Sequence, residues 1–257
     1  MREGRVLSNL GGVAIHQADE AAAQAYLEQA VAIHRATGNL AMEARVLNNV
    51  AALAISRGRF AESEAPLERV LALSRELKNP MEEATAMSHL GYLATRRGEF
   101  ARAQELHERA LATAREFGVR EFELEEMRHL GYVTLAQGEV TAARAHFRNA
   151  LAASKEIGSQ HEIALCLEAM TTLMAESDAH ELAARLLGAA DTLRTAIATP
   201  RAFGEQELYD KNVAHCRQAL GDAAVSTAVA AGAATSADAA VALAMAWIDA
   251  QDLGDAG

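Results

Sequence analysis

Apolar and small residues follow helical spacing through most of the chain. Two such stripes lie on either side of Gly98, with steps of three or four residues. The first consists of Met87, Leu90, Gly91 and Ala94, and the second of Ala103, Leu106, Ala110 and Ala114. Because one face of a helix returns about every 3.6 residues, the pattern predicts two helices of about 15 to 18 residues joined at this glycine.

The pattern of this segment returns every 40 residues. The paired positions near the centre of each first helix are Leu10-Gly11, Val50-Ala51, Leu90-Gly91, Leu130-Gly131 and Met170-Thr171. Glycines recur at the turn between the two helices (Gly58, Gly98, Gly138) and at the end of the second helix (Gly38, Gly118, Gly158), where the second copy has Lys78. Glycine suits a helix end because it adopts the left-handed backbone conformation without a Cβ clash.

Stacked helix pairs are the fold that this period predicts. Neither helix of a unit can bury its apolar stripe alone, so neighbouring units must cover one another. We therefore expect an all-α fold, a right-handed α-solenoid of helix-turn-helix repeats of about 40 residues. Pro66 lies inside the expected second helix of the second unit, where its missing backbone donor should kink that helix or delay its start.

One unit carries the features of a known repeat. Residues 130–143, followed by Phe147 and residues 150–151, combine a leucine-glycine pair, a turn glycine and an aromatic residue at fixed offsets. This stretch resembles a tetratricopeptide repeat (TPR), in which small residues let paired helices approach closely. The small positions are Gly131, Ala143 and Ala150. The resemblance implies a TPR-like array of about five helix pairs over residues 1–198, with a period longer than the usual about 34 residues.

The 40-residue register ends near Pro200, and a different segment follows. Residues 186–194, Pro200, Tyr209, Arg217, residues 220–222 and residues 235–244 resemble the closing segment of large bacterial ATP-binding transcriptional regulators of the LuxR and antibiotic-regulatory types. In those proteins a repeat array follows a nucleotide-binding domain. The resemblance implies that this chain is the sensor or regulatory region of such a regulator, or a freestanding relative.

The residues of this last segment predict a helical cap. An amphipathic helix is expected from Glu205 to Leu220, ended by Gly221, and Ser236 is a suitable N-cap for a helix running to about Ala250. These helices would cover the open face of the fifth unit. We therefore assign residues 199–257 to a C-terminal helical capping segment of the same solenoid, in which Trp247 is a packing residue.

Composition and charge narrow the classes of function. The formal net charge of −11 opposes binding to nucleic-acid phosphates. No stretch approaches the roughly 18 to 20 apolar residues of a membrane helix, so we expect a cytoplasmic protein. Two cysteines, Cys166 and Cys216, cannot form a four-ligand zinc site, and we expect both to be buried and reduced. No phosphate-binding loop or nucleophile motif is present, so we expect neither an enzyme nor a cofactor.

Two groups of residues invite a chemical hypothesis. His89 and His129 occupy the same slot of neighbouring repeats, but the equivalent slots hold Asn9, Asn49 and Ala169. A zinc site needs three or four ligands, so packing or solvent-facing roles are favoured and no metal is expected. Carboxylates also gather near a helix start, where they would complement the helix dipole and form a solvated face. They are Glu121, Glu123, Glu125 and Glu126.

The repeat register directs one set of side chains into the concave groove, on the first helix of each unit. The set is Arg45, Asn48, Ser88, Tyr92, Arg96, Arg128, Tyr132 and Leu135. Aromatic, amide and guanidinium groups supply stacking area and fixed donors for a peptide or a polar ligand. The alternative is that both tyrosines pack between repeats and the arginines pair with nearby glutamates.

These observations predict a non-catalytic protein-interaction and signal-sensing module, the regulatory part of a bacterial transcriptional regulator. Its partner would be a protein, a peptide or a small effector, without direct nucleic-acid binding or membrane association. Occupancy of the groove would change contacts with a neighbouring effector domain. The alternative function is a scaffold that self-associates into a homo-oligomer and has no effector ligand.

Overall fold

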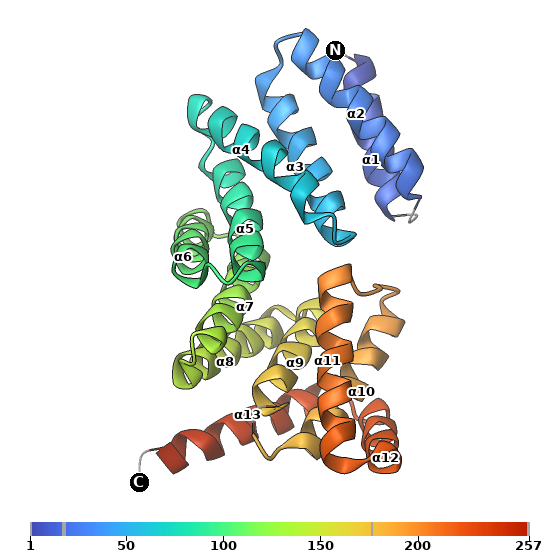
Figure 1. Cartoon of the computed structure of the whole chain (residues 1–257), viewed down its shortest axis with the longest axis vertical. Helices are drawn as coiled ribbons and strands as arrows, with labels where there is room; N and C mark the ends of the chain where they lie inside the picture. Colours follow the sequence, from blue (N-terminus) through green and yellow to red (C-terminus); the bar gives the residue numbers. More distant parts are fainter. Residues whose placement is uncertain (1, 17–18, 176, 256–257) are drawn as a thin grey trace. The chain divides into compact units, whose positions relative to one another are not determined.

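A computed structural model describes residues 2–16, 19–175 and 177–255. These residues form thirteen helices and no strand, so the predicted all-α class is confirmed (Figure 1). The first helices of the repeats are α1 (Arg2–His16), α3 (Leu40–Ser56), α5 (Pro80–Arg96), α7 (Arg120–Ala136) and α9 (Gln160–Ala175). The second helices are α2 (Glu20–Ala36), α4 (Phe60–Glu76), α6 (Phe100–Phe117), α8 (Val140–Ile157) and α10 (His180–Ala196). None of the described helices is long and apolar enough to cross a membrane.

Three further helices follow the repeats. They are α11 (Phe203–Leu220), α12 (Asp222–Ala233) and α13 (Ala237–Asp255). The first and last match the predicted capping helices, and the Ser236 hydroxyl accepts a hydrogen bond from the backbone amide of Ala239 as an N-cap should. Helix α12 was not predicted. Its alanine-rich sequence lacks the contrast between polar and apolar faces that reveals a helix in sequence.

The second helices of four repeats end at residues with a left-handed backbone conformation, at the exit positions that the sequence pattern predicts. The exit glycines Gly38, Gly118 and Gly158 have φ values of 64°, 67° and 69°. Lys78 and Ala198 occupy the same position in the second and fifth repeats, with φ values of 53° and 51°. The position therefore requires the left-handed conformation even where no glycine supplies it.

Helix α4 contains Pro66 but begins at the position that the 40-residue repeat predicts. Its first residue, Phe60, stands 40 residues before Phe100, the first residue of α6. Of the two alternatives, a kink or a delayed start, the delay does not occur, and α4 extends over 17 residues with the proline inside it. The apolar neighbours Leu67, Val70 and Leu73 are fully buried and hold the helix in place despite the missing backbone donor.

Close approach of the paired helices explains the small residue at the centre of each first helix. A Cβ atom on Gly11 would lie 2.7 Å from the Leu27 side chain, one on Gly91 would lie 2.7 Å from His107, and one on Gly131 would lie 2.4 Å from Phe147. The three facing residues are spaced by 80 and 40 residues, as the glycines are, and both intervals are multiples of the repeat. The repeated glycine slot therefore receives the side chain of the second helix in each unit.

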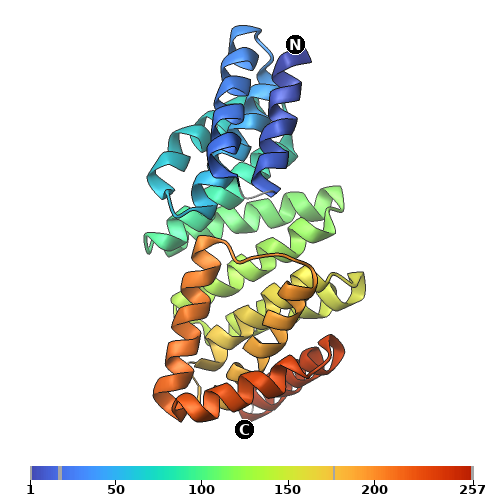
Figure 2. The same ribbon diagram turned by 90° about the vertical axis from the view of Figure 1, so that its right-hand side faces the viewer.

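The chain forms two compact units, Met1–Gly118 and Val119–Gly257. In the first unit, consecutive helices from α1 to α6 pack as neighbours, and Figure 2 gives a second view of each pair. In the second unit, α12 packs closely on α10, and a Cβ atom on Gly188 would lie 2.1 Å from the carbonyl oxygen of Val229. Helix α11 contacts α9, α10 and α12, and α13 contacts α8, α9 and α10.

Candidate ligand-binding surface

In the first unit, the predicted groove residues form a strip along α3 and α5. Arg45 is exposed and Asn48 is half-buried, one turn further along α3. The Asn48 Oδ1 and His89 Nδ1 atoms lie 3.1 Å apart, so this hydrogen bond joins the two helices. Burial raises the pKa of Glu82 on α5, while Arg45 and a hydrogen bond from Asn48 act in the opposite direction.

The other end of this strip is built around Phe60. The Tyr92 ring meets the Phe60 ring edge to face, with ring centres 6.0 Å apart. The exposed Arg96 guanidinium lies 5.0 Å from the centre of the same ring. Stacking on an aromatic ring restricts a guanidinium that would otherwise be mobile. Ser88 also lies on α5 but is only 2% exposed, so it contributes to packing.

In the second unit, Arg128 and Tyr132 lie one turn apart on α7. Arg128 is 8% exposed, and its Nε atom has no hydrogen-bond partner among the described residues. Burial is the largest single influence on the pKa of Arg128 and would lower it, but the combined effect of Glu162, Tyr132, Cys166 and Glu125 outweighs burial, and the net pKa is raised. Burial raises the pKa of Glu162, and Arg128 acts to lower it. The two buried side chains therefore influence each other's pKa through electrostatic attraction.

Tyr132 and Leu135 have packing roles in the second unit. The Tyr132 ring meets the Phe147 ring edge to face at 5.3 Å, and burial raises the pKa of its hydroxyl. Leu135 is 7% exposed. The eight predicted residues thus divide between the units, with Arg45, Asn48, Ser88, Tyr92 and Arg96 in the first and Arg128, Tyr132 and Leu135 in the second. The exposed members, Arg45 and Arg96, are both in the first unit.

A buried ion network in the second unit was not predicted. The Glu168 carboxylate of α9 accepts hydrogen bonds from Arg194 at 2.8 Å and from Arg201 at 2.6 Å. Arg201 also donates to Asp191 at 2.5 Å, and the Tyr209 hydroxyl donates to the same carboxylate at 2.7 Å. These bonds join α9 and α10 to the loop before α11 and to α11. These partners lie 10 to 33 positions apart and give no periodic signal, so sequence reasoning could not pair them.

Two of the four clustered carboxylates contradict the prediction of a solvated face. Glu126 is 0% exposed and Glu123 is 9% exposed, while Glu121 lies on the surface. Glu126 occupies the slot that Val46 and Ala86 fill in the earlier first helices, which is an inward slot in each. The dipole argument applied to the helix start, but the repeat register decides the face at this position.

The two cysteines lie in the core of the second unit. Both cysteines are buried and free, as predicted, and burial raises the pKa of the Cys166 thiol to about 11. A thiol with so high a pKa is a poor nucleophile at neutral pH. His129 lies 3.7 Å from Glu125. Among the described residues, no group of three or more histidine, cysteine, aspartate or glutamate side chains could hold a metal ion.

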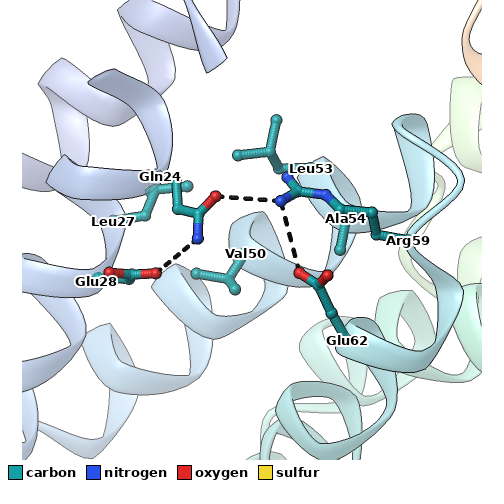
Figure 3. Close-up of a pocket in the computed structure, with 8 residues that line it drawn as sticks. All are labelled: Gln24, Leu27, Glu28, Val50, Leu53, Ala54, Arg59 and Glu62. Atoms are coloured by element: carbon teal, nitrogen blue, oxygen red, sulfur yellow. Dashed lines mark hydrogen bonds and ion pairs between the residues drawn. The ribbon is translucent and has the colours of Figure 1, made fainter. Parts of the chain in front are cut away.

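A small hollow lies between α2, α3 and α4 in the first unit (Figure 3). Its volume is about 200 Å³, and Leu27, Val50 and Leu53 form its apolar lining. Arg59 crosses it, donating to Gln24 Oε1 at 3.2 Å and lying 3.6 Å from Glu62. Sites for small-molecule ligands usually enclose about 300–1,000 Å³. The hollow is therefore too small for a typical effector.

The helix pairs and their glycine slots define an all-helical repeat protein of the solenoid class. A family model of the tetratricopeptide repeat matches residues 2–76 and 42–116. Two solved structures of nearly identical TPR-like repeats from a kinesin-light-chain-type protein of Podosopora anserina align with TM-scores of 0.50. They share 19% and 18% identity, and the alignments cover 83% and 85% of this chain and 94% and 97% of those chains. No curated protein sequence matches the chain significantly.

These comparisons establish TPR repeats in the first half of the chain and a TPR-like helical fold for most of its length. The TPR resemblance of the sequence is thereby confirmed. Neither the family model nor these two structures links the chain to a bacterial transcriptional regulator. At identities below 20%, the structural neighbours indicate the fold and carry no information about the partner of this chain.

Proposed function

We propose that this chain is a non-catalytic protein-interaction module that binds an acidic peptide segment along the first helices of its repeats. The observation that carries this proposal is the strip on α3 and α5, where exposed Arg45 and Arg96 flank Asn48, His89 and Tyr92. The arginines offer paired donors for carboxylates, and Tyr92 offers apolar area beside them. On a chain with a net charge of −11, two exposed arginines and the polar groups between them form a distinct local surface.

A more specific role, regulation of transcription, is supported by the resemblance of the C-terminal segment. Residues 186–244 resemble the closing segment of bacterial ATP-binding regulators, which supports a regulatory role in transcription and a cytoplasmic location. Peptide or effector binding would then favour one arrangement of a neighbouring effector domain. Mass spectrometry of the endogenous polypeptide tests this part, since a transcriptional regulator must carry or recruit a DNA-binding domain.

Peptide display against the full chain tests the binding surface. Selected peptides should be rich in aspartate or glutamate, and their affinity should fall at least about fivefold in the Arg96→Ala and Tyr92→Ala variants. Arg102→Ala is the matched control, because Arg102 is an exposed arginine of the same unit that pairs with Glu99 at 3.0 Å. Equal binding by all variants would refute the strip as the site.

The alternative function, a self-associating scaffold, predicts a different behaviour. Light scattering of the full chain over the micromolar range should then show oligomers without any added ligand. Our proposal instead predicts that the monomeric chain binds the peptide.

A further inference from the structure

Two oppositely charged side chains in the second unit each bury a polar atom that has no hydrogen-bond partner among the described residues. The atoms are Nε of Arg128 on α7 and Oε2 of Glu162 on α9, and both residues are 8% exposed. Helices α7 and α9 pack against each other (Figure 1). Against the effect of burial, Glu162 is the group that most raises the pKa of Arg128, so the two charges are close. A buried polar atom without a hydrogen bond is costly and calls for an explanation.

A completed pair of the same kind exists elsewhere in this unit. Arg194 donates to the two oxygens of Glu168 through hydrogen bonds of 2.8 Å each, and Glu168 follows Glu162 on the same helix. A guanidinium and a carboxylate that meet in this way satisfy each other's donors and acceptors. The Arg128 Nε and Glu162 Oε2 atoms are not satisfied in this way. A group that accepts from one and donates to the other would complete both.

The repeat itself does not require an arginine at this position. The equivalent residues of the first three repeats are Ser8, Asn48 and Ser88, which are smaller and uncharged. Ser88 is 2% exposed, so the position is buried in its repeat as well. Because burial of a charged group costs free energy, packing between repeats does not account for a guanidinium here. Arg128 is therefore a feature of this repeat and not of the array.

The surroundings of Arg128 run from the solvent to the core of the unit. Glu125, Arg128, His129 and Tyr132 lie on one face of α7, because their spacing follows the helical period. The side chains of Glu125 and His129 are 41% and 16% exposed. Cys166 on α9, which also contributes to the raised pKa of Arg128, is only 1% exposed. A small molecule in solution can therefore approach the guanidinium from the Glu125 side.

We propose that Arg128 and Glu162 form a binding site for a free amino acid, bound as a zwitterion. The ligand carboxylate accepts hydrogen bonds from the Arg128 guanidinium, and the ligand ammonium group donates to Glu162. An anion alone would be repelled by Glu162 and a cation alone by Arg128, whereas a zwitterion compensates both charges. In a free α-amino acid both charged groups are attached to one carbon atom, so a single small molecule reaches both side chains. This site is separate from the strip on α3 and α5 and does not depend on peptide binding there.

Thermal unfolding of the full chain in the presence of the standard amino acids, added one at a time, tests the site. At least one amino acid should raise the unfolding temperature in a saturable manner. Its N-acetyl derivative lacks the ammonium group and its amide derivative lacks the carboxylate, so each should bind at least about tenfold more weakly. The absence of a shift with every amino acid would overturn the proposal. Equal binding of the N-acetyl derivative would also overturn it, since the site would then accept any carboxylate.

Two substitutions assign the roles of the protein groups, with calorimetric titration of the selected amino acid as the measurement. Arg128→Gln should weaken binding at least about tenfold. In Glu162→Gln, the affinity for the amino acid should fall towards that for its N-acetyl derivative, because the carboxylate that distinguishes the two ligands is gone. A merely structural role of Glu162 would leave this selectivity unchanged.

Arg144→Gln is the matched control for both variants. Arg144 is 5% exposed in the same unit and lies 2.7 Å from Asp252, so it has a partner of its own. This variant should bind the amino acid as the wild type does, and circular dichroism shows whether each variant is folded. Wild-type selectivity in a folded Glu162→Gln variant would overturn the proposal, and so would equal losses of affinity in Arg144→Gln and Arg128→Gln.

Discussion

Lys78 and Ala198 have left-handed backbone conformations although neither is a glycine. For a residue with a Cβ atom this conformation costs about 1–2 kcal/mol relative to the right-handed one. The repeat tolerates the cost because the helix on each side is already fixed by packing. The two positions are therefore points of stored strain in an otherwise regular array.

Lys78→Gly should stabilise the first unit by about 0.5–1 kcal/mol. Glycine relieves the Cβ clash of the left-handed conformation, and its larger entropy in the unfolded chain offsets part of the gain. Urea denaturation followed by circular dichroism measures the change. Gly38→Ala is the control at the equivalent position and should destabilise the unit; a loss of stability in Lys78→Gly would contradict the strain argument.

Glu43 gives the first unit a pH-dependent contribution to stability. Burial alone would raise the pKa of this carboxyl, but hydrogen bonds from Arg69 and Arg35 and their charges outweigh burial and lower it below 4.5. The folded state therefore binds its proton more weakly than the unfolded state. The contribution is fully present above the ordinary pKa and is lost as the pH falls through the lower folded value.

Glu43→Gln should lower the free energy of unfolding by about 1 kcal/mol at pH 7. Both arginines are partly exposed, with side chains 61% and 44% accessible, which limits the effect. The difference between wild type and variant should shrink as the pH falls below about 4. Urea midpoints measured from pH 3 to pH 7 test this; a difference independent of pH would show that the charge of Glu43 is unimportant.

Packing of paired helices depends on the glycine slot. In α7 and α8 this slot brings Gly131 against Phe147, which is fully buried. The second repeat, which lies in the first compact unit, makes the same contact with Ala51 and Leu67 in the two positions. Between these two repeats, the larger residue on the first helix goes with the smaller side chain on the second, as close packing requires.

Gly131→Ala should destabilise the second compact unit by about 1–2 kcal/mol. The new methyl group would meet the Phe147 ring, and the higher helix propensity of alanine recovers only part of the cost. Adding Phe147→Leu recreates the Ala51–Leu67 pair, so the double variant should be more stable than the sum of the single effects. Additive effects of the two substitutions in a double-mutant cycle would argue against this contact.

The sequence predicted the elements of the array well because its signal is local and repeated. The spacing of Leu90 and Leu130 and the glycines at Gly98 and Gly138 located helices and turns without any tertiary information. The candidate site was harder to predict from the sequence. Ser88 and Arg128 follow the same register as Tyr92 but are buried, since burial depends on which neighbours cover each helix.

The C-terminal helices are held to the repeats by charge as well as by apolar packing. Glu168 is 6% exposed and accepts hydrogen bonds from both Arg194 and Arg201. Removing one partner from a buried network leaves the other charges uncompensated, which costs more than the network itself contributes. Glu168 positions Arg194 and Arg201, and α11 adds direct hydrogen bonds of its own, from Arg194 to Glu205, from Tyr209 to Asp191 and from Asn212 to Thr171.

Glu168→Ala should destabilise the second unit by about 3 kcal/mol, with the loss concentrated around α11. Hydrogen exchange should rise in residues 203–220 more than in α7 or α8. Arg217→Gln is the control, since Arg217 and Asp222 form an exposed pair at 3.4 Å and its removal should change stability by less than about 0.5 kcal/mol. Unchanged exchange in α11 would show that the attachment of this helix does not depend on Glu168.

The sequence by itself determined the helical class, the 40-residue period, the turn positions and the cysteines' burial, because each follows from local spacing and backbone preference. Only the tertiary structure decided the burial of Glu126, the Glu168 network and the packing of α12 on α10. These features depend on which surfaces meet across long separations in the chain. Periodicity records the shape of one repeat, whereas contact between repeats also depends on which neighbour is present.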